Sequence, residues 1–176
     1  TLLAKVVPTS DKSPITLTIG EPQFETPAFI QVALKESTHL LNKYPKSAGE
    51  TILKEAIQGF IQKRFKLTLE LNEIIPTFGT REVLFNFPQF ILFDKKAPTM
   101  AFTNPFYQIY EGAAIASRAK IIHIDLEASN DFKPNIDEKI LQETDLVILN
   151  FPNNPTTSTL DLDELGLGDI SQYPTI

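Results

Sequence analysis

The sequence predicts an α/β fold with a mainly parallel sheet and crossover helices. Beyond residue 73, short apolar runs alternate with helical patterns, and β-α-β alternation of this kind produces parallel strands joined by right-handed crossovers. The run Leu146–Leu149 is apolar throughout, as expected of a strand buried on both faces. With 176 residues, a 42% hydrophobic fraction and 13 Phe, the chain can form one sizeable core.

Before the sheet, the sequence predicts two helices. Residues 1–14 have the pattern of a helix end followed by a loop, and residues 15–20 form a short extended segment. Residues 29–41 carry apolar side chains at helical spacing. The clearest helix follows, and its apolar stripe consists of Ile52, Leu53, Ala56, Ile57, Phe60, Ile61 and Phe65. Ser47 and Glu50 fit a capping box at its start, and we expect this helix to cover the sheet.

The remaining elements follow in strict alternation. The predicted strands are 73–78, 98–103, 120–126 and the run that begins at Asp145. The predicted helices are 83–93, a helix that follows the segment 104–110 and runs through Ala119, and 136–143. Lys120 is interpreted as a cation at a helix end.

Two polar loops are candidates for a binding site. Gly79-Thr80-Arg81-Glu82 places a glycine, a hydroxyl and a cation at the amino end of a helix, a combination that binds phosphate. The alternative is an ordinary turn in which Thr80 is the N-cap. Asn150 to Pro155 ends the last strand, and ligands of open α/β sheets bind at the carboxyl ends of strands. An ordinary strand-to-helix loop is the alternative there.

Composition disfavours several classes of function. A net charge of −6 disfavours nucleic-acid binding, which requires a basic surface. The absence of Cys excludes disulfides and thiolate metal sites, and no apolar run has the length of a membrane span. Together with the lack of a signal pattern, this favours a cytoplasmic protein. His39 and His123 are expected to be structural, since no second ligand is spaced to share a metal with either.

Five landmarks occur in the order of one enzyme family: Ile19-Gly20-Glu21-Pro22, Lys43-Tyr44-Pro45, Gly79-Thr80-Arg81-Glu82, Asn104-Pro-Phe-Tyr-Gln-Ile-Tyr110 and Asn153-Asn154-Pro155-Thr156. The chain resembles the N-terminal part of the fold-type I, pyridoxal-phosphate-dependent aminotransferases of classes I and II. Within that family it is most similar to the N-succinyldiaminopimelate and aspartate aminotransferase-like group. The resemblance implies an N-terminal arm and small-domain segment over residues 1–45, and an incomplete pyridoxal-phosphate-binding large domain over residues 46–176.

The resemblance also implies which residues bind pyridoxal 5'-phosphate. Gly79, Thr80 and Arg81 would hold its phosphate, Tyr107 would lie on the pyridine face, and Asn154 would donate to the phenolic oxygen. Tyr110 is the better candidate for a core aromatic. The resemblance further implies cis peptide bonds at Asn104–Pro105 and Asn154–Pro155. The glycine that usually follows Asn-Pro-Thr in the family is Thr157 here.

Substrates and partners follow from the same resemblance. Amino-acid and 2-oxo-acid substrates are implied, with the α-carboxylate bound by the Gly20 backbone N–H. Tyr44 would contact the cofactor of a second copy, which implies a homodimer with shared sites.

The family's covalent-anchor lysine, its pyridine-nitrogen aspartate and its carboxylate-binding arginine all follow the Asn-Pro landmark, and no counterpart is found in this sequence. We therefore expect the 176 residues to be an N-terminal fragment that is inactive alone, since that lysine both holds the cofactor and moves the α-proton. Two alternatives remain open: a C–S lyase or related enzyme that uses the same cofactor, and a truncated chain without catalytic function.

Overall fold

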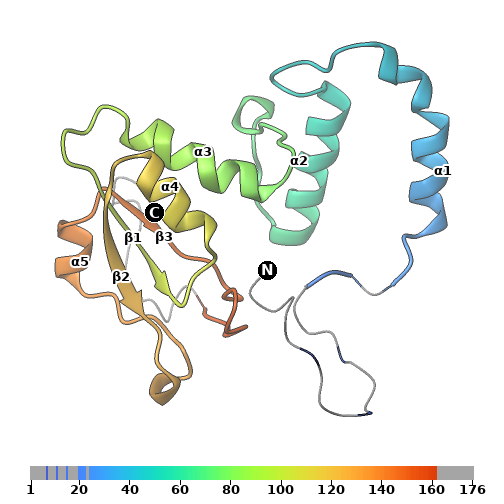
Figure 1. Ribbon diagram of the computed structural model, residues 1–176. Coiled ribbons are helices and arrows are strands. Elements are labelled where there is room, and N and C mark those ends of the chain that lie inside the picture. The colour runs from blue at the N-terminus through green and yellow to red at the C-terminus, as the bar shows by residue number, and fades with distance from the viewer. Residues whose placement is uncertain (1–6, 8–10, 12–14, 16–19, 23, 162–176) are drawn as a thin grey trace. The chain divides into compact units, whose positions relative to one another are not determined.

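The computed structural model of the chain describes residues 7, 11, 15, 20–22 and 24–161 (Figure 1). The chain divides into two compact units, Thr1–Glu50 and Thr51–Ile176. Most of residues 1–19, for which a helix end and an extended segment are predicted, lie outside the described residues. None of the helices in the described ranges is long and apolar enough to cross a membrane.

In the first unit, the helix predicted over residues 29–41 is present as two shorter ones. These are α1 (Ala28–Glu36) and the 3-10 helix η2 (Thr38–Asn42). The interruption is at Ser37, whose N–H donates to the carbonyl oxygens of Ala33 and Leu34. The Thr38 hydroxyl donates to the Lys35 carbonyl at 2.9 Å, and side-chain bonds of this kind compete with continuation of the helix.

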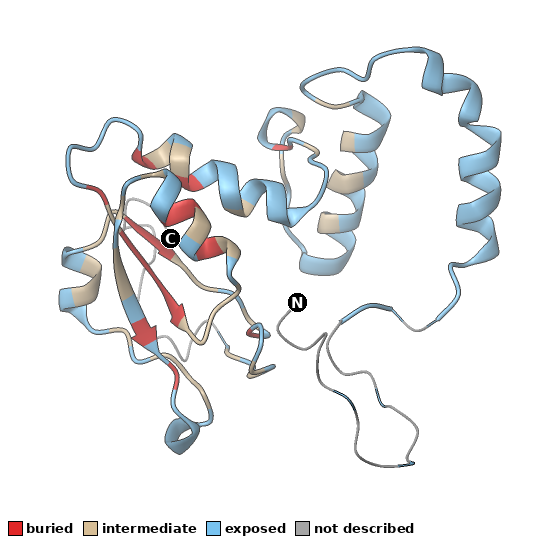
Figure 2. Cartoon of the chain, viewed as in Figure 1, coloured by how far each residue is buried: buried red, intermediate tan, exposed pale blue. Residues whose placement is uncertain are grey.

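The second unit contains a three-stranded parallel sheet, which confirms the predicted fold class. Its order is β2-β1-β3, formed by β1 (Thr99–Asn104), β2 (Lys120–Asp125) and β3 (Leu146–Ile148). In the parallel register, Phe102 of β1 lies opposite His123 of β2 and Ile148 of β3. The central strand is the most deeply buried, as the red segments of Figure 2 show.

Helices cover both faces of this sheet. On one face, α3 (Thr80–Leu92) and α4 (Ile109–Ala116) supply Leu92, Tyr110 and Ala114 to a core that includes Met100 and Phe102. On the other face, α5 (Glu138–Gln142) supplies partly buried side chains that pack against Ala101, Ile124 and Val147. Side chains of β1 alternate between these two cores because successive residues of a strand point to opposite faces.

The prediction of a strand at residues 73–78 is wrong. Leu71–Glu73 form a 3-10 helix, η3, and residues 74–78 form no strand. Glu73 accepts the Glu70 backbone N–H at 2.7 Å, and Glu70 caps the turn in return, so these backbone groups are already bonded locally. Ile74 is buried, but none of the described strands pairs with it. A β-type sequence forms a strand only where a neighbouring strand is available.

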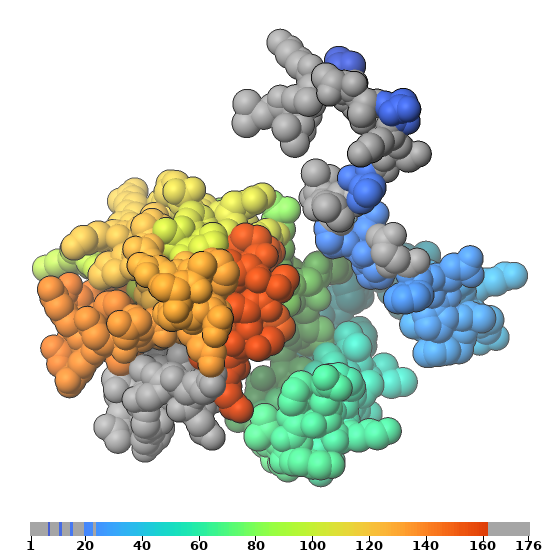
Figure 3. Space-filling view, turned by 90° about the horizontal axis from the view of Figure 1, so that it is seen from below, coloured from blue at the N-terminus to red at the C-terminus, as the bar shows by residue number. Residues whose placement is uncertain are grey.

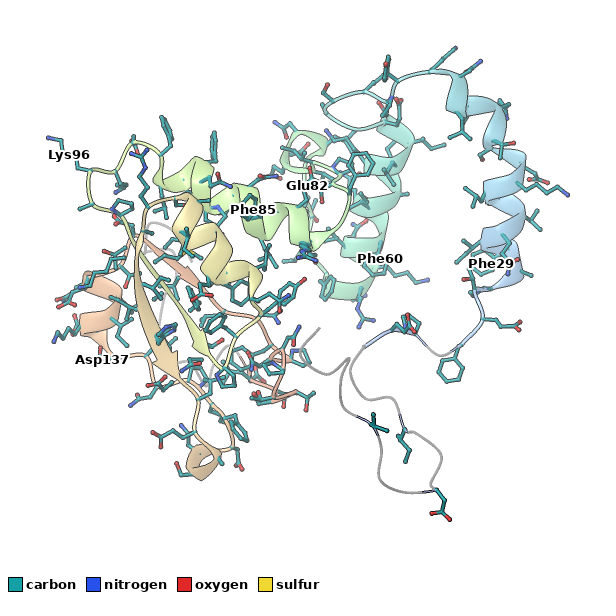
Figure 4. The ribbon with its side chains drawn as sticks, viewed as in Figure 1. Phe29, Phe60, Glu82, Phe85, Lys96 and Asp137 are labelled. Atoms are coloured by element: carbon teal, nitrogen blue, oxygen red, sulfur yellow. The ribbon has the colours of Figure 1, made fainter. Side chains whose placement is uncertain are left out.

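Helix α2 (Thr51–Phe65) corrects two further predictions. It begins directly after Glu50, so Ser47 is not its N-cap, and Glu50 instead accepts the Lys46 backbone N–H at 3.1 Å. It also does not cover the sheet. No residue of α2 is buried, and among the described elements it packs mainly against η3. Gln58 Nε2 also donates to the carbonyl of Leu69, in the segment between α2 and η3. Phe60, labelled in Figure 4, is 59% exposed.

The helix predicted to extend through residue 119 ends earlier, at Ala116. The Ser117 hydroxyl donates to the Ala113 carbonyl at 2.8 Å, and Arg118 takes a left-handed conformation with φ 56°. Lys120 is therefore not a helix-end cation. It opens β2, and its N–H donates to the Pro98 carbonyl at 2.8 Å.

Asp145 fixes the start of β3 against the start of β1. Its N–H donates to the Thr99 carbonyl at 2.9 Å, and its carboxylate accepts the Thr99 N–H at 2.9 Å. Lys95 Nζ lies 3.1 Å from the same carboxylate. The Thr99 hydrogen bond and then the Lys95 ammonium hold the pKa of Asp145 below its ordinary value, although partial burial acts in the opposite direction.

The turn after β3 contains a non-glycine residue in a conformation that favours glycine. Thr157 has φ 60°, and its N–H donates to the Asn153 carbonyl at 2.7 Å. Its side chain is exposed. For a β-branched residue this conformation costs about 1–2 kcal/mol, because Cβ approaches the following carbonyl oxygen.

Replacing Asp145 by Asn should lower the free energy of unfolding at pH 7 by about 1–2 kcal/mol, because two charge-assisted interactions become neutral or are lost. A lowered folded-state pKa stabilises the fold above the ordinary carboxyl pKa of 3.8, and this stabilisation disappears as pH falls through the lowered value. Urea unfolding between pH 7 and pH 2 should therefore show a weaker acid dependence in the variant. Asp94→Asn is the control, since the described structure shows no hydrogen bond or ion pair for that neighbouring carboxylate. An equal loss in both variants would contradict this account.

Replacing Thr157 by Gly should raise the free energy of unfolding by about 0.5–1 kcal/mol, the relief of strain being partly offset by the greater entropy of glycine in the unfolded chain. Thr159→Gly is the matched control in the same loop, because Thr159 is exposed and has no positive φ. The control should be neutral or destabilised in urea titrations. A destabilised Thr157→Gly variant would show that the left-handed turn is not strained.

Candidate functional site

The amino end of α3 has no side-chain cap. Gly79 occupies the N-cap position with φ 113°, a conformation that few other residues adopt, and none of the described side chains bonds the N–H groups of the first turn. The helix starts at Thr80, so the interpretation of Thr80 as N-cap is wrong. A Cβ at Gly79 would meet nothing within 4 Å, which leaves the helix end open to a ligand.

The side chains at this helix end suit an anion. Thr80 and Arg81 are exposed, so a hydroxyl and a guanidinium accompany the open N–H groups. The one acidic residue of the first turn is Glu82, which is labelled in Figure 4. Its carboxylate accepts the Phe78 backbone N–H at 2.9 Å. Because backbone dipole and side chains both favour negative charge, this end of α3 has the chemistry of a phosphate site.

The loop after β1 carries Tyr107. It opens with the Asn104–Pro105 peptide bond, which is cis as predicted. Tyr107 is partly buried, and its ring meets the Tyr110 ring edge-on, with centroids 6.0 Å apart. Tyr110 is only 2% exposed, so it is the core aromatic, as expected. Burial, and secondarily the neighbouring Tyr107, raise the pKa of the Tyr110 phenol.

The loop after β3 carries Asn154. Its Asn154–Pro155 bond is cis as predicted, and Phe151–Pro152 is cis as well. Asn154 is exposed, whereas the preceding Asn153 is only 3% exposed. Asn153 Oδ1 accepts a hydrogen bond from the Thr103 hydroxyl at 3.3 Å, which joins this loop to the end of β1. The sequence shows two adjacent asparagines and contains no signal that distinguishes the buried one.

These loops lie at the carboxyl edge of the sheet. Tyr107 and Asn154 follow β1 and β3, which are adjacent strands, and the bond between Thr103 and Asn153 holds the two loops together. A second bond, from Asn104 Nδ2 to Asp125 Oδ1 at 2.9 Å, ties the end of β1 to the end of β2. Gly79, Thr80 and Arg81 are consecutive at the start of α3, which packs on the same sheet.

The other two predicted site residues, Gly20 and Tyr44, belong to the first unit, and both are exposed. Several cavities in the described part of the second unit are lined by residues other than those predicted to bind the cofactor. One of them, of about 390 Å³, is lined by residues that include Lys95, Lys96 and Arg118, and another, of about 220 Å³, lies between α3 and β3.

Each of the two histidines contacts a neighbouring protein group. His123 stacks on Phe106 with centroids 5.5 Å apart, and His39 Nδ1 lies 2.8 Å from the Glu36 carbonyl oxygen. Within the described ranges, no group of three or more His, Cys, Asp or Glu side chains is placed to hold a metal ion.

Two solved aminotransferase structures are similar to this chain in sequence and fold. Aminotransferase AspB from Helicobacter pylori is 59% identical with a TM-score of 0.86, over 93% of this chain and 43% of that one. An aminotransferase from Neisseria meningitidis is 36% identical with a TM-score of 0.85, over 99% of this chain and 46% of that one.

Curated aminotransferase sequences are also similar to this chain. Aspartate aminotransferase from Pyrococcus horikoshii is 32% identical over 84% of this chain, and LL-diaminopimelate aminotransferase from Nitratidesulfovibrio vulgaris is 29% identical over the same share. The chain spans 38% and 39% of the length of these two relatives. The family model for aminotransferase class I and II matches residues 12–166. The chain therefore belongs to the class I and II aminotransferase family, of which it has the α/β fold in part.

Proposed function

We propose that this chain forms the N-terminal part of a pyridoxal-phosphate-dependent aminotransferase and supplies much of its cofactor site. The observation that carries the proposal is the open amino end of α3, where Gly79 leaves the helix uncapped next to Thr80 and Arg81. Membership of the class I and II family, whose enzymes use pyridoxal phosphate, supports it.

The phosphate group fits this helix end. It is a dianion with several acceptor oxygens, and the first-turn N–H groups, the Thr80 hydroxyl and the Arg81 guanidinium are all donors. Arg81 adds charge, whereas Thr80 and the backbone add directed hydrogen bonds. Glu82 does not compete for the position, because its carboxylate is bonded to the Phe78 N–H.

The ring would be held by the two strand-end loops. Tyr107 offers an aromatic ring, which packs against the buried Tyr110 in a T-shaped pair. Asn154 offers a side-chain amide that would donate to the phenolic oxygen and so favour its anionic form. When bound, pyridoxal phosphate acts as an electron sink that stabilises negative charge at the substrate α-carbon.

Substrate binding and assembly extend the proposal to the first unit. We assign the Gly20 N–H to the α-carboxylate of an amino acid or 2-oxo acid. Tyr44 is fully exposed, and we assign it to the cofactor phosphate of a second copy in a homodimer. The relatives act, by name, on aspartate and on LL-diaminopimelate. Both are amino acids with a second carboxylate, which supports an amino donor with more than one carboxylate, such as N-succinyldiaminopimelate.

The assignment of a phosphate site to the start of α3 predicts the ratio of the chain's affinities for a phosphorylated and an unphosphorylated ligand. Pyridoxine 5'-phosphate should bind more tightly than pyridoxine. Thr80→Ala and Arg81→Ala should each reduce this preference about 5–20-fold, because Thr80→Ala removes one neutral hydrogen bond and Arg81→Ala removes one charge-assisted hydrogen bond. Calorimetric titration measures both affinities. Arg118→Ala, which removes an exposed cation at the opposite edge of the sheet, should leave the ratio unchanged. Equal affinities for the two ligands in the unaltered chain would contradict the assignment.

The 176 residues alone should bind the cofactor without transferring an amino group, because the residue that anchors it covalently in the family has no counterpart here. Incubation with pyridoxal phosphate, aspartate and 2-oxoglutarate should yield no glutamate. Borohydride treatment followed by mass spectrometry should find no single lysine modified in preference to the others. Selective labelling of Lys120, or measurable transfer, would show that this chain carries its own anchor.

A further inference from the structure

Asn153 is buried, with only 3% of its surface exposed, and it makes four hydrogen bonds to other described residues. Its N–H donates to the Ser158 carbonyl at 2.9 Å, and its carbonyl accepts the Thr157 N–H. Its side-chain oxygen accepts from the Thr103 hydroxyl, and its side-chain nitrogen donates to the Thr156 hydroxyl oxygen at 2.8 Å. One asparagine therefore closes the turn and attaches it to β1.

The network continues beyond Asn153. Thr156 Oγ1 and Ser158 Oγ lie 2.9 Å apart, and the Ser158 hydroxyl donates to the Phe132 carbonyl at 3.2 Å. The turn is thus attached to the central strand on one side and to the segment after β2 on the other. Figure 3 shows the loop, in orange-red, at the surface of the second unit beside this orange segment.

Asn154, the next residue, differs from Asn153 in exposure and in hydrogen bonding. It is exposed, and the described structure shows no hydrogen bond for its side chain. An exposed amide on a mobile loop loses conformational freedom when it binds a ligand, and this loss weakens binding. An amide whose neighbour is fixed by four bonds loses less, because its backbone is already held in place.

We propose that Asn153 is a positioning residue, which fixes the loop after β3 so that the adjacent Asn154 amide is held in place to donate to the phenolic oxygen of the bound cofactor. The inference rests on the proposed function and deepens it. Asn153 itself does not touch the cofactor; it acts through the backbone that it shares with Asn154. The Thr103 hydroxyl has the same role from the side of the sheet, since it supplies the bond to β1.

Three variants test the proposal in the full chain. Thr103→Val removes the bond to β1 without adding charge, and Asn153→Asp keeps the side-chain shape but removes its donor. Asn154→Ala removes the proposed cofactor donor and leaves the anchor intact. Asn150→Asp is the matched control, because Asn150 is an exposed asparagine of the same loop whose amide donates to the Pro152 carbonyl.

The first readout needs no ligand. Amide hydrogen exchange, followed by NMR, should be at least tenfold faster at the Asn153 and Thr157 N–H groups in Thr103→Val and Asn153→Asp than in the unaltered chain. The Phe102 amide in the middle of β1 serves as the internal reference. Asn150→Asp and Asn154→Ala should leave all three rates unchanged. Unchanged rates in Thr103→Val and Asn153→Asp would overturn the anchoring part of the inference.

The second readout is the ultraviolet absorbance of bound pyridoxine 5'-phosphate, which reports ionisation of its phenolic group. The pKa of that group should rise in Thr103→Val and Asn153→Asp toward its value in Asn154→Ala, although Asn154 is still present in both. The neutral Thr103→Val variant separates this effect from the added charge of aspartate. Faster exchange with an unchanged phenolic pKa would overturn the positioning role.

Failure of the proposed function has a different signature. If the unaltered chain does not bind pyridoxine 5'-phosphate, the cofactor assignment fails and the positioning role fails with it. The exchange rates then still decide whether Asn153 anchors the loop.

Discussion

The structure of the second unit depends on the two-sided pairing of β1. This strand bonds to β2 along its whole length and to β3 over three residues, and its central residues are buried completely. Burial removes their backbone groups from water, so these groups must be bonded to neighbouring strands. Apolar side chains on both faces of β1 then require a helical cover on each side, which α3 and α4 provide on one face and α5 on the other.

The same pairing creates the candidate site. Because all three strands are parallel, their carboxyl ends meet at one edge, and the loops that leave them meet there too. The polar residues at these strand ends reinforce the arrangement: Thr103 bonds to Asn153, and Asn104 bonds to Asp125. At the other edge, Asp145 and Thr99 exchange two hydrogen bonds that set the register between β3 and β1. A rigid sheet thus holds loops whose exposed residues remain available for a ligand.

Much of the apolar surface lies away from this core. Several phenylalanines of α2 and α3 are exposed, among them Phe60, Phe85 and Phe90. The chain spans about two fifths of the length of the relatives it matches. In a protein of that family, an apolar stripe such as that of α2 is predicted correctly from its spacing, but what it packs against depends on which other parts of the fold are present. The stripe is therefore a property of the sequence, whereas burial of such a stripe depends on tertiary contacts.

The sequence by itself determined the parallel α/β fold, the presence of its three strands to within one or two residues, and the presence of the helices α3 and α4 but not the end of α4, because hydrophobic periodicity and turn residues are local signals. It also identified the family, and with it the cis bonds at Pro105 and Pro155. Only the tertiary structure decided that residues 74–78 form no strand, that Gly79 rather than Thr80 precedes α3, and that Asn153 is the buried member of the Asn153-Asn154 pair. Each of these outcomes depends on a partner distant in the sequence or on the exact position of a helix end, and neither is encoded in the local pattern of apolar and polar residues.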